Sequence, residues 1–142
     1  TRCHQLGLYM ILDSPLNMLC DSPSNYLAEE ECCNFIAGIP TICDETRFLD
    51  GHVGEYVVSA RRSGDEWYIG GITDWNSRTL NLELSFLPEG EYELTLFMDG
   101  VNANRKATDY KVIKKTITRA ETLTVLLAQG GGFALKLEKK AK

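Results

Sequence analysis

The 142-residue chain contains only four prolines and two histidines, and it has no cysteine after residue 43. Its five cysteines are odd in number, and they have neither the CxxC nor the cysteine–histidine spacing of a zinc site. We interpret them as buried thiols that act as small apolar side chains. The alternative is a cysteine nucleophile paired with His4 or His52, for which the sequence supplies no orienting third group. The cysteines are Cys3, Cys20, Cys32, Cys33 and Cys43.

The chain also lacks a basic face and a long apolar run. Its net charge is −5, and its only basic cluster is the tail formed by Lys136, Lys139, Lys140 and Lys142, which we interpret as a solvated end. This charge excludes a nucleic-acid partner, because phosphate binding needs clustered cations. No apolar run approaches the roughly 18 residues of a membrane span. With 44% hydrophobic residues, the composition predicts one soluble globular domain with a core.

In residues 1–45, apolar residues recur at helical spacing in two stretches, which are separated by a short apolar run. Apolar residues at helical spacing predict a helix over residues 1–13, ending where Pro15 removes a backbone donor. The apolar run 16–19 predicts a buried strand, and a second helix is expected over residues 24–37. A single strand between two helices cannot form a sheet, so this pattern predicts packing partners upstream of residue 1.

After residue 53 the apolar period changes to two, which is typical of β-strands. Seven runs separated by turn residues predict seven short antiparallel strands packed as a β-sandwich. We expect its core to include Val57, Trp67 or Tyr68, and alternate leucines of the later strands. The runs are EYVVSARR, EWYIGGIT, TLNLELSF, EYELTLFM, YKVIKKTI, TLTVLLA and FALKLEK.

Several stretches resemble the C-terminal end of glycoside hydrolase family 97, the bacterial α-glucosidases and α-galactosidases typified by Bacteroides starch-utilisation enzymes. The most specific are GDEWYIGGITDW and DGVNANRKATDYK, and SPLNMLCDSPSNYL and GGGFALKLE extend the likeness to essentially the whole chain. The resemblance implies a fold that is mainly β: a C-terminal β-sandwich over residues 46–142, preceded by residues 1–45 as the helix–strand–helix end of a catalytic (β/α)8 barrel.

The resemblance also implies which chemistry this chain lacks. Glycoside hydrolysis needs two carboxyl groups about 5 to 10 Å apart, and the family's pair belongs to barrel strands upstream of residue 1. The carboxylates that hold a calcium ion in the parent enzyme lie there as well. We therefore expect no catalytic and no metal-ligating residue here, and no activity of this chain alone. The parent enzyme is expected to act on α-linked gluco- or galacto-oligosaccharides in the periplasm, with the upstream barrel as this chain's partner.

Two acidic positions are candidates for a role in the intact enzyme. Barrel sites lie at the C-terminal ends of strands, and Asp21 occupies that position after the expected strand 16–19. We therefore predict Asp21 as a substrate-binding residue that contacts a sugar hydroxyl; the alternative is a local turn and helix-capping role. Asp44 and Glu45 are adjacent on an extended chain, so they point to opposite sides and are interpreted as structural.

Three aromatic residues raise a second function, an independent carbohydrate-binding module. Sugars stack on exposed rings, and an exposed row of Trp67, Tyr68 and Trp75 would favour it over a structural domain that braces the barrel. Trp67 and Tyr68 alternate on one strand, so at least one of them is expected in the core. Gly130–Gly132 precede a strand rather than a helix and predict a turn, not a phosphate loop.

The apolar residues of the segment 1–45 need cover when the barrel is absent. We expect either a dimer of this chain through that segment, or docking of its helices onto the sandwich. The seven strands supply two inner faces, which predicts a sandwich whose stability does not depend on residues 1–45.

Overall fold

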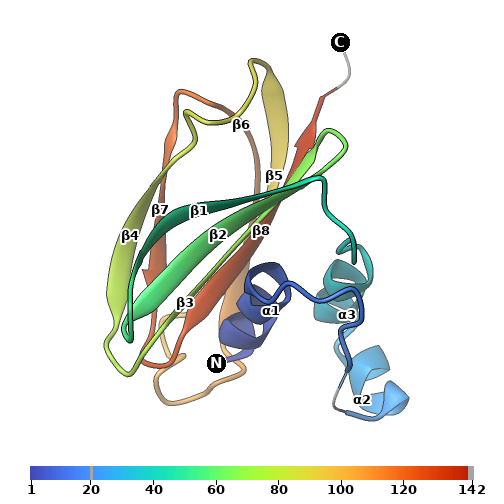
Figure 1. Cartoon of the computed structure of the whole chain (residues 1–142). Helices are drawn as coiled ribbons and strands as arrows, with labels where there is room; N and C mark the ends of the chain where they lie inside the picture. Colours follow the sequence, from blue (N-terminus) through green and yellow to red (C-terminus); the bar gives the residue numbers. More distant parts are fainter. Residues whose placement is uncertain (20, 141–142) are drawn as a thin grey trace.

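The computed structural model describes residues 1–19 and 21–140, and it places the strands in two antiparallel layers (Figure 1). The larger sheet has six strands in the order β1-β2-β3-β8-β5-β6, and the smaller sheet pairs β4 with β7. The predicted β-sandwich is therefore confirmed. The strands are β1 (Glu45–His52), β2 (Tyr56–Ser63), β3 (Glu66–Thr73), β4 (Arg78–Glu83), β5 (Glu91–Asp99), β6 (Tyr110–Thr118), β7 (Thr122–Leu127) and β8 (Gly132–Lys139).

All seven expected strands are present, and β1 is an eighth that the sequence pattern did not predict. β1 pairs with β2 at the edge of the large sheet, and its register shifts between Phe48 and Asp50. Most of its side chains are exposed, so its apolar residues do not alternate with polar ones. An edge strand with an irregular register loses the period-two signal on which the prediction depended.

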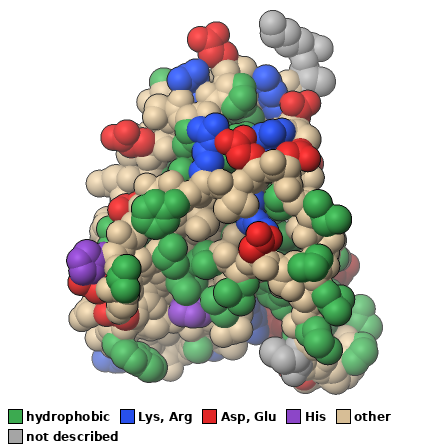
Figure 2. All heavy atoms as spheres, in the orientation of Figure 1, with side chains coloured by type: hydrophobic (Ala, Val, Ile, Leu, Met, Phe, Trp, Pro, Cys, Tyr) green, Lys and Arg blue, Asp and Glu red, His purple; other side chains and the backbone are tan. Residues whose placement is uncertain are grey.

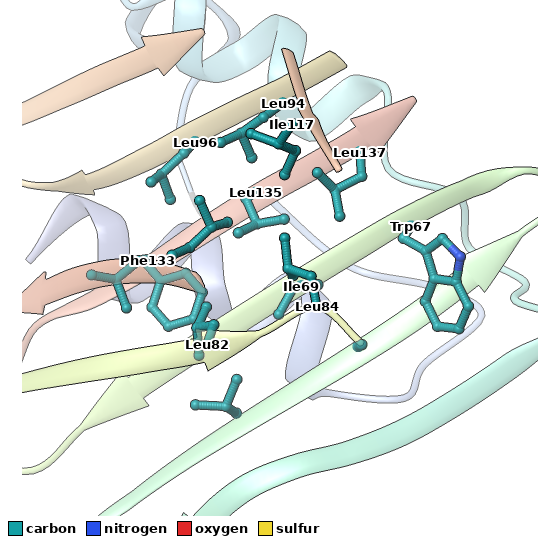
Figure 3. Packing of buried hydrophobic residues seen from close by; sticks show 14 of the residues in the cluster. Trp67, Ile69, Leu82, Leu84, Leu94, Leu96, Ile117, Phe133, Leu135 and Leu137 are labelled. Atoms are coloured by element: carbon teal, nitrogen blue, oxygen red, sulfur yellow. The ribbon is translucent and has the colours of Figure 1, made fainter. Parts of the chain in front are cut away.

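The main core lies between the two sheets and contains inward-facing leucines of β4, β5, β7 and β8, several of which are labelled in Figure 3. Trp67 and Ile69 enter this core from β3, as expected for one of the two aromatic residues at positions 67 and 68. The expectation for Val57 was wrong. Val58 and Ala60 are the residues of β2 that are buried in this cluster, whereas Val57 is half-buried and lies outside it. Two adjacent valines left the inward face of this strand ambiguous, and the β2–β3 register places Val58 on it.

Helix α1 (Arg2–Ile11) packs on the outer face of the large sheet, across β3 and β8 (Figure 1). Its side chains Cys3, Leu6 and Met10 are buried in a second cluster with Tyr68, and with Phe97 and Ala134 of β5 and β8. The expected docking of helices onto the sandwich is therefore present for α1. Because both faces of the large sheet are covered, Trp67 and Tyr68 are both buried although they point in opposite directions.

Glycines on both partners allow α1 to approach the sheet closely. A Cβ on Gly70 would lie 2.5 Å from the Met10 Cβ and 2.7 Å from the Gly7 carbonyl oxygen. A Cβ on Gly132 would lie 2.8 Å from the His4 Cα. Gly70, the first glycine of YIGGIT, and Gly132, the last glycine of the GGG turn, thus leave room for the helix backbone on the sheet. This packing argues against our expectation that the sandwich is stable without residues 1–45.

The end of α1 is fixed by a buried cation. Arg61 is buried on β2 and donates to the Leu12 carbonyl oxygen at 3.2 Å and to the Asp13 carboxylate. At the other end, the Thr1 hydroxyl accepts a hydrogen bond from the His4 amide at 3.1 Å and caps the helix. Both ends of α1 are therefore tied by side-chain hydrogen bonds.

The expected strand over residues 16–19 is wrong for this chain, because the segment forms no strand and lies exposed. Leu16 is 73% exposed and Met18 is 80% exposed. A strand needs a neighbouring strand to pair its backbone groups, and none of the described strands lies beside this segment. Figure 2 shows hydrophobic side chains gathered on the side of the molecule where this segment and the helices after it lie.

The second expected helix is divided into two, α2 (Pro23–Ala28) and α3 (Glu30–Ala37). The break falls at Glu29, whose backbone leaves helical geometry at φ −117° and ψ 52°. α3 contributes to the outer cluster through Cys32, with Phe35 and Ile36 packed against it. Among the described residues, no helix is long and apolar enough to cross a membrane.

Candidate functional site

Asp21 lies in the turn that leads into α2, where it is exposed. Its Oδ1 accepts hydrogen bonds from the Ser22 amide at 2.6 Å and the Asn25 side-chain amide at 2.7 Å. These donors hold the pKa of the Asp21 carboxyl below its usual range. The carboxyl is therefore ionised at neutral pH and is an acceptor only, which suits a turn or a contact with a sugar hydroxyl but not a general acid.

Asp21 lines a cavity of about 420 Å³ between the three helices and the loop before β6. Tyr9, Asn25 and Cys33 also line it, and so does Glu29. The Glu29 carboxylate is held by the Arg2 guanidinium through two hydrogen bonds of 2.8 and 3.0 Å. Glu29 is thus engaged in an ion pair, and the cavity presents no free pair of carboxyl groups of the kind that glycoside hydrolysis requires. The substrate contact of Asp21 stays a prediction.

Asp44 and Glu45 both accept hydrogen bonds from groups in or next to the paired strands β1 and β2. Asp44 accepts the Gly64 amide at 2.8 Å, and Glu45 accepts from Arg47 and from Arg62 at 3.2 Å. The hydrogen bonds from the two arginines lower the pKa of Glu45. Both carboxylates bind groups at the edge of the sheet, which agrees with their structural interpretation.

The three aromatic residues do not form an exposed row. Trp67 and Tyr68 are each only 2% exposed, whereas Trp75 is 83% exposed. The Tyr68 hydroxyl donates to Glu66 at 2.5 Å, and burial is the largest cause that raises its pKa. A platform for stacking sugar rings needs several exposed aromatic faces. The geometry expected of a carbohydrate-binding module is therefore absent from these positions.

The described cysteines lie in surroundings that suit apolar packing rather than nucleophilic attack. Burial raises the pKa of the Cys3, Cys32 and Cys43 thiols, which keeps them protonated. The two histidines are engaged elsewhere: a ring nitrogen of His4 lies 3.2 Å from the Gly131 carbonyl oxygen, and His52 pairs with Glu55. Cys20 lies outside the described residues. Within residues 1–19 and 21–140, no three potential metal ligands cluster.

Asp99 is a buried carboxylate that the sequence indicated only as part of an Asp-Gly turn. Its Oδ2 accepts the backbone amides of Ala128 and Gly132, each at 2.9 Å, and so ties the end of β5 to the β7–β8 turn. A Cβ on Gly131 would lie 2.0 Å from this oxygen, so the second glycine of the GGG turn makes room for Asp99. The turn predicted for Gly130–Gly132 is confirmed, and its partner is a carboxylate of the chain itself.

The charged and polar groups described above are thus used to hold loops, sheet edges and helix ends together. Large apolar side chains remain exposed in the segment after α1 and in several loops and strand ends of the described structure. By its fold the chain belongs to the class of two-layer antiparallel β-sandwich domains.

The chain belongs to the family described as glycosyl-hydrolase 97 C-terminal, oligomerisation, whose model matches residues 42–138. It is 56% identical over 138 residues to a retaining α-galactosidase of Bacteroides thetaiotaomicron, covering 97% of this chain and 21% of that enzyme. It is 33% identical over 131 residues to a probable retaining α-galactosidase of Streptomyces bingchenggensis, covering 92% of this chain and 19% of that protein. The expected resemblance to family 97 is therefore confirmed.

A solved structure supports the same assignment. The fold matches a glycoside hydrolase family 97 enzyme from Pseudoalteromonas sp. strain K8, in complex with acarbose, with a TM-score of 0.94 and 36% identity. The match covers 98% of this chain and 22% of that enzyme. The chain thus spans about a fifth of the length of the relatives that it matches.

Proposed function

We propose that this chain is the C-terminal, non-catalytic part of a retaining α-galactosidase-like enzyme, in which it braces the catalytic barrel. The observation that carries the proposal is the match of nearly the whole chain to about a fifth of a family 97 enzyme. Galactosides are favoured over glucosides because both curated relatives are named as α-galactosidases. The substrate of the intact enzyme is accordingly an α-linked galactoside.

The apolar segment between α1 and α2 supplies a physical reason for the bracing role. Leu16 and Met18 are exposed in this segment and Leu27 is exposed on α2, although apolar side chains of this size favour burial by about 1.5 to 3 kcal/mol each. A barrel packed on residues 12–27 would remove this surface from water. In that setting, residues 16–19 would find the neighbouring strands that they lack here, and residues 1–45 would form the last helix, strand and helix of the barrel, with the sandwich beginning at residue 46.

The catalytic carboxylates and the ligands of a calcium ion belong, in this proposal, to the barrel upstream of residue 1. The side chains of this chain fit neither role, because the carboxylates described above are held by backbone amides or by arginine. Asp21 is the one residue that we assign to the substrate, as an acceptor for a sugar hydroxyl. We place the intact enzyme in the periplasm on the resemblance to its family alone.

The proposal is tested by assaying the purified 142-residue chain on nitrophenyl α-galactoside and nitrophenyl α-glucoside. The intact Bacteroides relative serves as the positive control. We expect hydrolysis at the rate of buffer, because the transition-state-stabilising groups are missing from this chain. Turnover proportional to chain concentration, retained through a second purification step, would show that the chain carries its own active site.

The alternative, a free-standing carbohydrate-binding module, predicts a different result. Such a module would be retarded on affinity electrophoresis through a galactan gel. Because Trp67 and Tyr68 are buried, we expect the chain to migrate as it does without polysaccharide. Retardation that disappears in the Trp75→Ala variant would favour the module instead.

A further inference from the structure

One end of the sandwich carries three exposed apolar side chains from three separate elements. Trp75 lies in the β3–β4 turn, Val101 lies in the loop after β5, and Leu126 lies near the end of β7. Trp75 is 83% exposed and Val101 is 96% exposed, while Leu126 is about half exposed. The β3–β4 turn, the β5–β6 loop and the β7–β8 turn all lie at the end of the molecule that also holds the N-terminus (Figure 1). We call this surface the Trp75 end.

The Trp75 end combines a projecting ring with a hollow. A cavity of about 500 Å³ opens there, and its apolar wall is formed by Val101, Leu126 and Leu127. Polar and charged side chains form much of the remaining wall, among them Arg78, Lys111, Asn104 and Gln129. The hollow thus has an apolar side next to hydrogen-bonding and charged groups, and protein–protein contacts likewise combine an apolar core with a polar rim.

Trp75 is fixed at the rim of this hollow. A Cβ on Gly130 would lie 3.6 Å from the indole ring, and the Gly130 amide donates to the Asp74 carbonyl oxygen at 2.7 Å. Gly130 has a φ of +59°, a left-handed conformation that glycine adopts without strain, and it follows Gln129 of the cavity wall. The turn that carries Trp75 is therefore held directly beside the hollow, although the indole itself remains largely in solvent.

We propose that the Trp75 end is the surface through which two copies of this chain associate, with Trp75 of each copy entering the hollow of the other. In a two-fold contact each copy presents the same patch, which must be self-complementary, and a projection beside a hollow on one surface can meet that requirement. Tryptophan is also enriched among the residues that dominate the binding energy of interfaces.

A second copy is the occupant favoured by the family to which the chain belongs. Its model is described as an oligomerisation domain and matches residues 42–138, a range that contains all three apolar residues of the Trp75 end. Another exposed apolar surface, around Leu16 and Met18, lies outside that range and is assigned above to the upstream barrel. This inference deepens the family's description by naming the surface, and it does not depend on the substrate of the intact enzyme.

The experiment is sedimentation velocity on the 142-residue chain from about 5 to 300 μM, with Trp75→Ala and Leu126→Glu as variants. Both variants alter exposed side chains, so thermal unfolding should stay within 2 °C or so of the unchanged chain. We expect a concentration-dependent dimer that both variants weaken at least about tenfold. The matched control is Met18→Ala, another exposed apolar residue, which should change the dimerisation constant less than about twofold.

Fluorescence provides a second readout, because Trp67 and Trp75 are the only tryptophans and Trp67 is buried. Quenching by acrylamide should fall as the concentration rises through the dimerisation range, since the contact covers Trp75. Two results would overturn the inference. One is a chain that stays monomeric at 300 μM with Trp75 fully quenched. The other is a dimer that Met18→Ala weakens and Trp75→Ala does not, which would place the contact on the segment after α1. Neither result bears on whether this chain hydrolyses glycosides, which the assay proposed above tests separately.

Discussion

Replacing Gly70 by alanine tests whether α1 is seated on the sheet as the structure places it. The added methyl group would lie 2.5 Å from the Met10 Cβ and 2.7 Å from the Gly7 carbonyl oxygen. Both contacts are to atoms at or next to the helix backbone, so no rotamer change can relieve them. The helix must move away as a body, and Cys3, Leu6 and Met10 then lose part of their burial.

The magnitude follows from the cost of overpacking. An extra methyl group in a well-packed core costs about 1 to 3 kcal/mol. For a chain of this length, each kcal/mol lost from the free energy of unfolding lowers the melting temperature by roughly 3 °C. We therefore expect Gly70→Ala to lower the melting temperature by about 3 to 9 °C. Amide hydrogen exchange should also become faster in α1, because its contacts with the sheet loosen.

Gly38→Ala is the matched control. Gly38 has a φ of −83°, which alanine adopts freely, and an added Cβ would lie 3.5 Å from the nearest atom, the Phe35 carbonyl oxygen. This substitution should leave stability unchanged or raise it by about 0.4 to 1 kcal/mol, because alanine restricts the unfolded chain. Circular dichroism melts of the three proteins provide the comparison. Equal melting temperatures for Gly70→Ala and the unchanged chain would refute the packing of α1 described here.

Three further predictions concern charged residues. Asp99→Ala leaves the amides of Ala128 and Gly132 without their buried acceptor, so urea unfolding should show a free energy of unfolding lower by about 2 to 4 kcal/mol. The control is Asp65→Ala at an exposed position, which should lower the free energy of unfolding by less than about 0.5 kcal/mol. For Glu66, burial raises the pKa of the carboxyl, but hydrogen bonds from Tyr68 and Lys136 outweigh burial and the net shift of the pKa is downward. The ionised carboxylate therefore stabilises the fold above pH about 4.5, and this stabilisation is lost as the pH falls through the lowered pKa. Glu66→Gln should accordingly reduce the fall of the melting temperature at acid pH, and an unchanged fall would contradict this. Arg61→Met removes the donor to the Leu12 carbonyl oxygen and should cost about 1 to 3 kcal/mol, with unchanged urea unfolding as the contrary result.

Much of the fold could be predicted from the sequence because the later strands keep a regular alternation. Leu82 of β4, Leu84 directly after it, and Leu94 and Leu96 of β5 face the core as predicted. β1 was missed because it pairs only at the sheet edge, with a shifted register and mostly exposed side chains. A period-two pattern reports burial on one face, and this strand buries little.

Other features depend on contacts that no local pattern encodes. Residues 16–19 have the composition of a buried strand, yet they form no strand here, and Leu16, Met18 and Leu19 remain exposed. Tyr68 is buried because α1 covers the outer face of β3, a contact between segments about 60 residues apart. The glycines at positions 70 and 132 were interpreted as strand and turn residues, and their role as a seat for α1 depends on that same distant contact.

The candidate site, like the fold, could be predicted from the sequence only in part. The local turn around Asp21 could be predicted from the order of its residues, and the structure shows the hydrogen bonds of that turn. The buried carboxylate of Asp99 could not, because its partners lie about 30 residues away in the β7–β8 turn. The sugar contact of Asp21 stays a prediction that the intact enzyme must test.

We propose that this chain works as the C-terminal, non-catalytic domain of a larger α-glycosidase, and the most direct measurement is to read the coding DNA upstream of the Thr1 codon. We expect an open reading frame that continues upstream in frame and encodes alternating strands and helices of a barrel, with carboxylates at the C-terminal ends of its strands. An in-frame stop codon close upstream, followed by a start codon directly before Thr1, would contradict it.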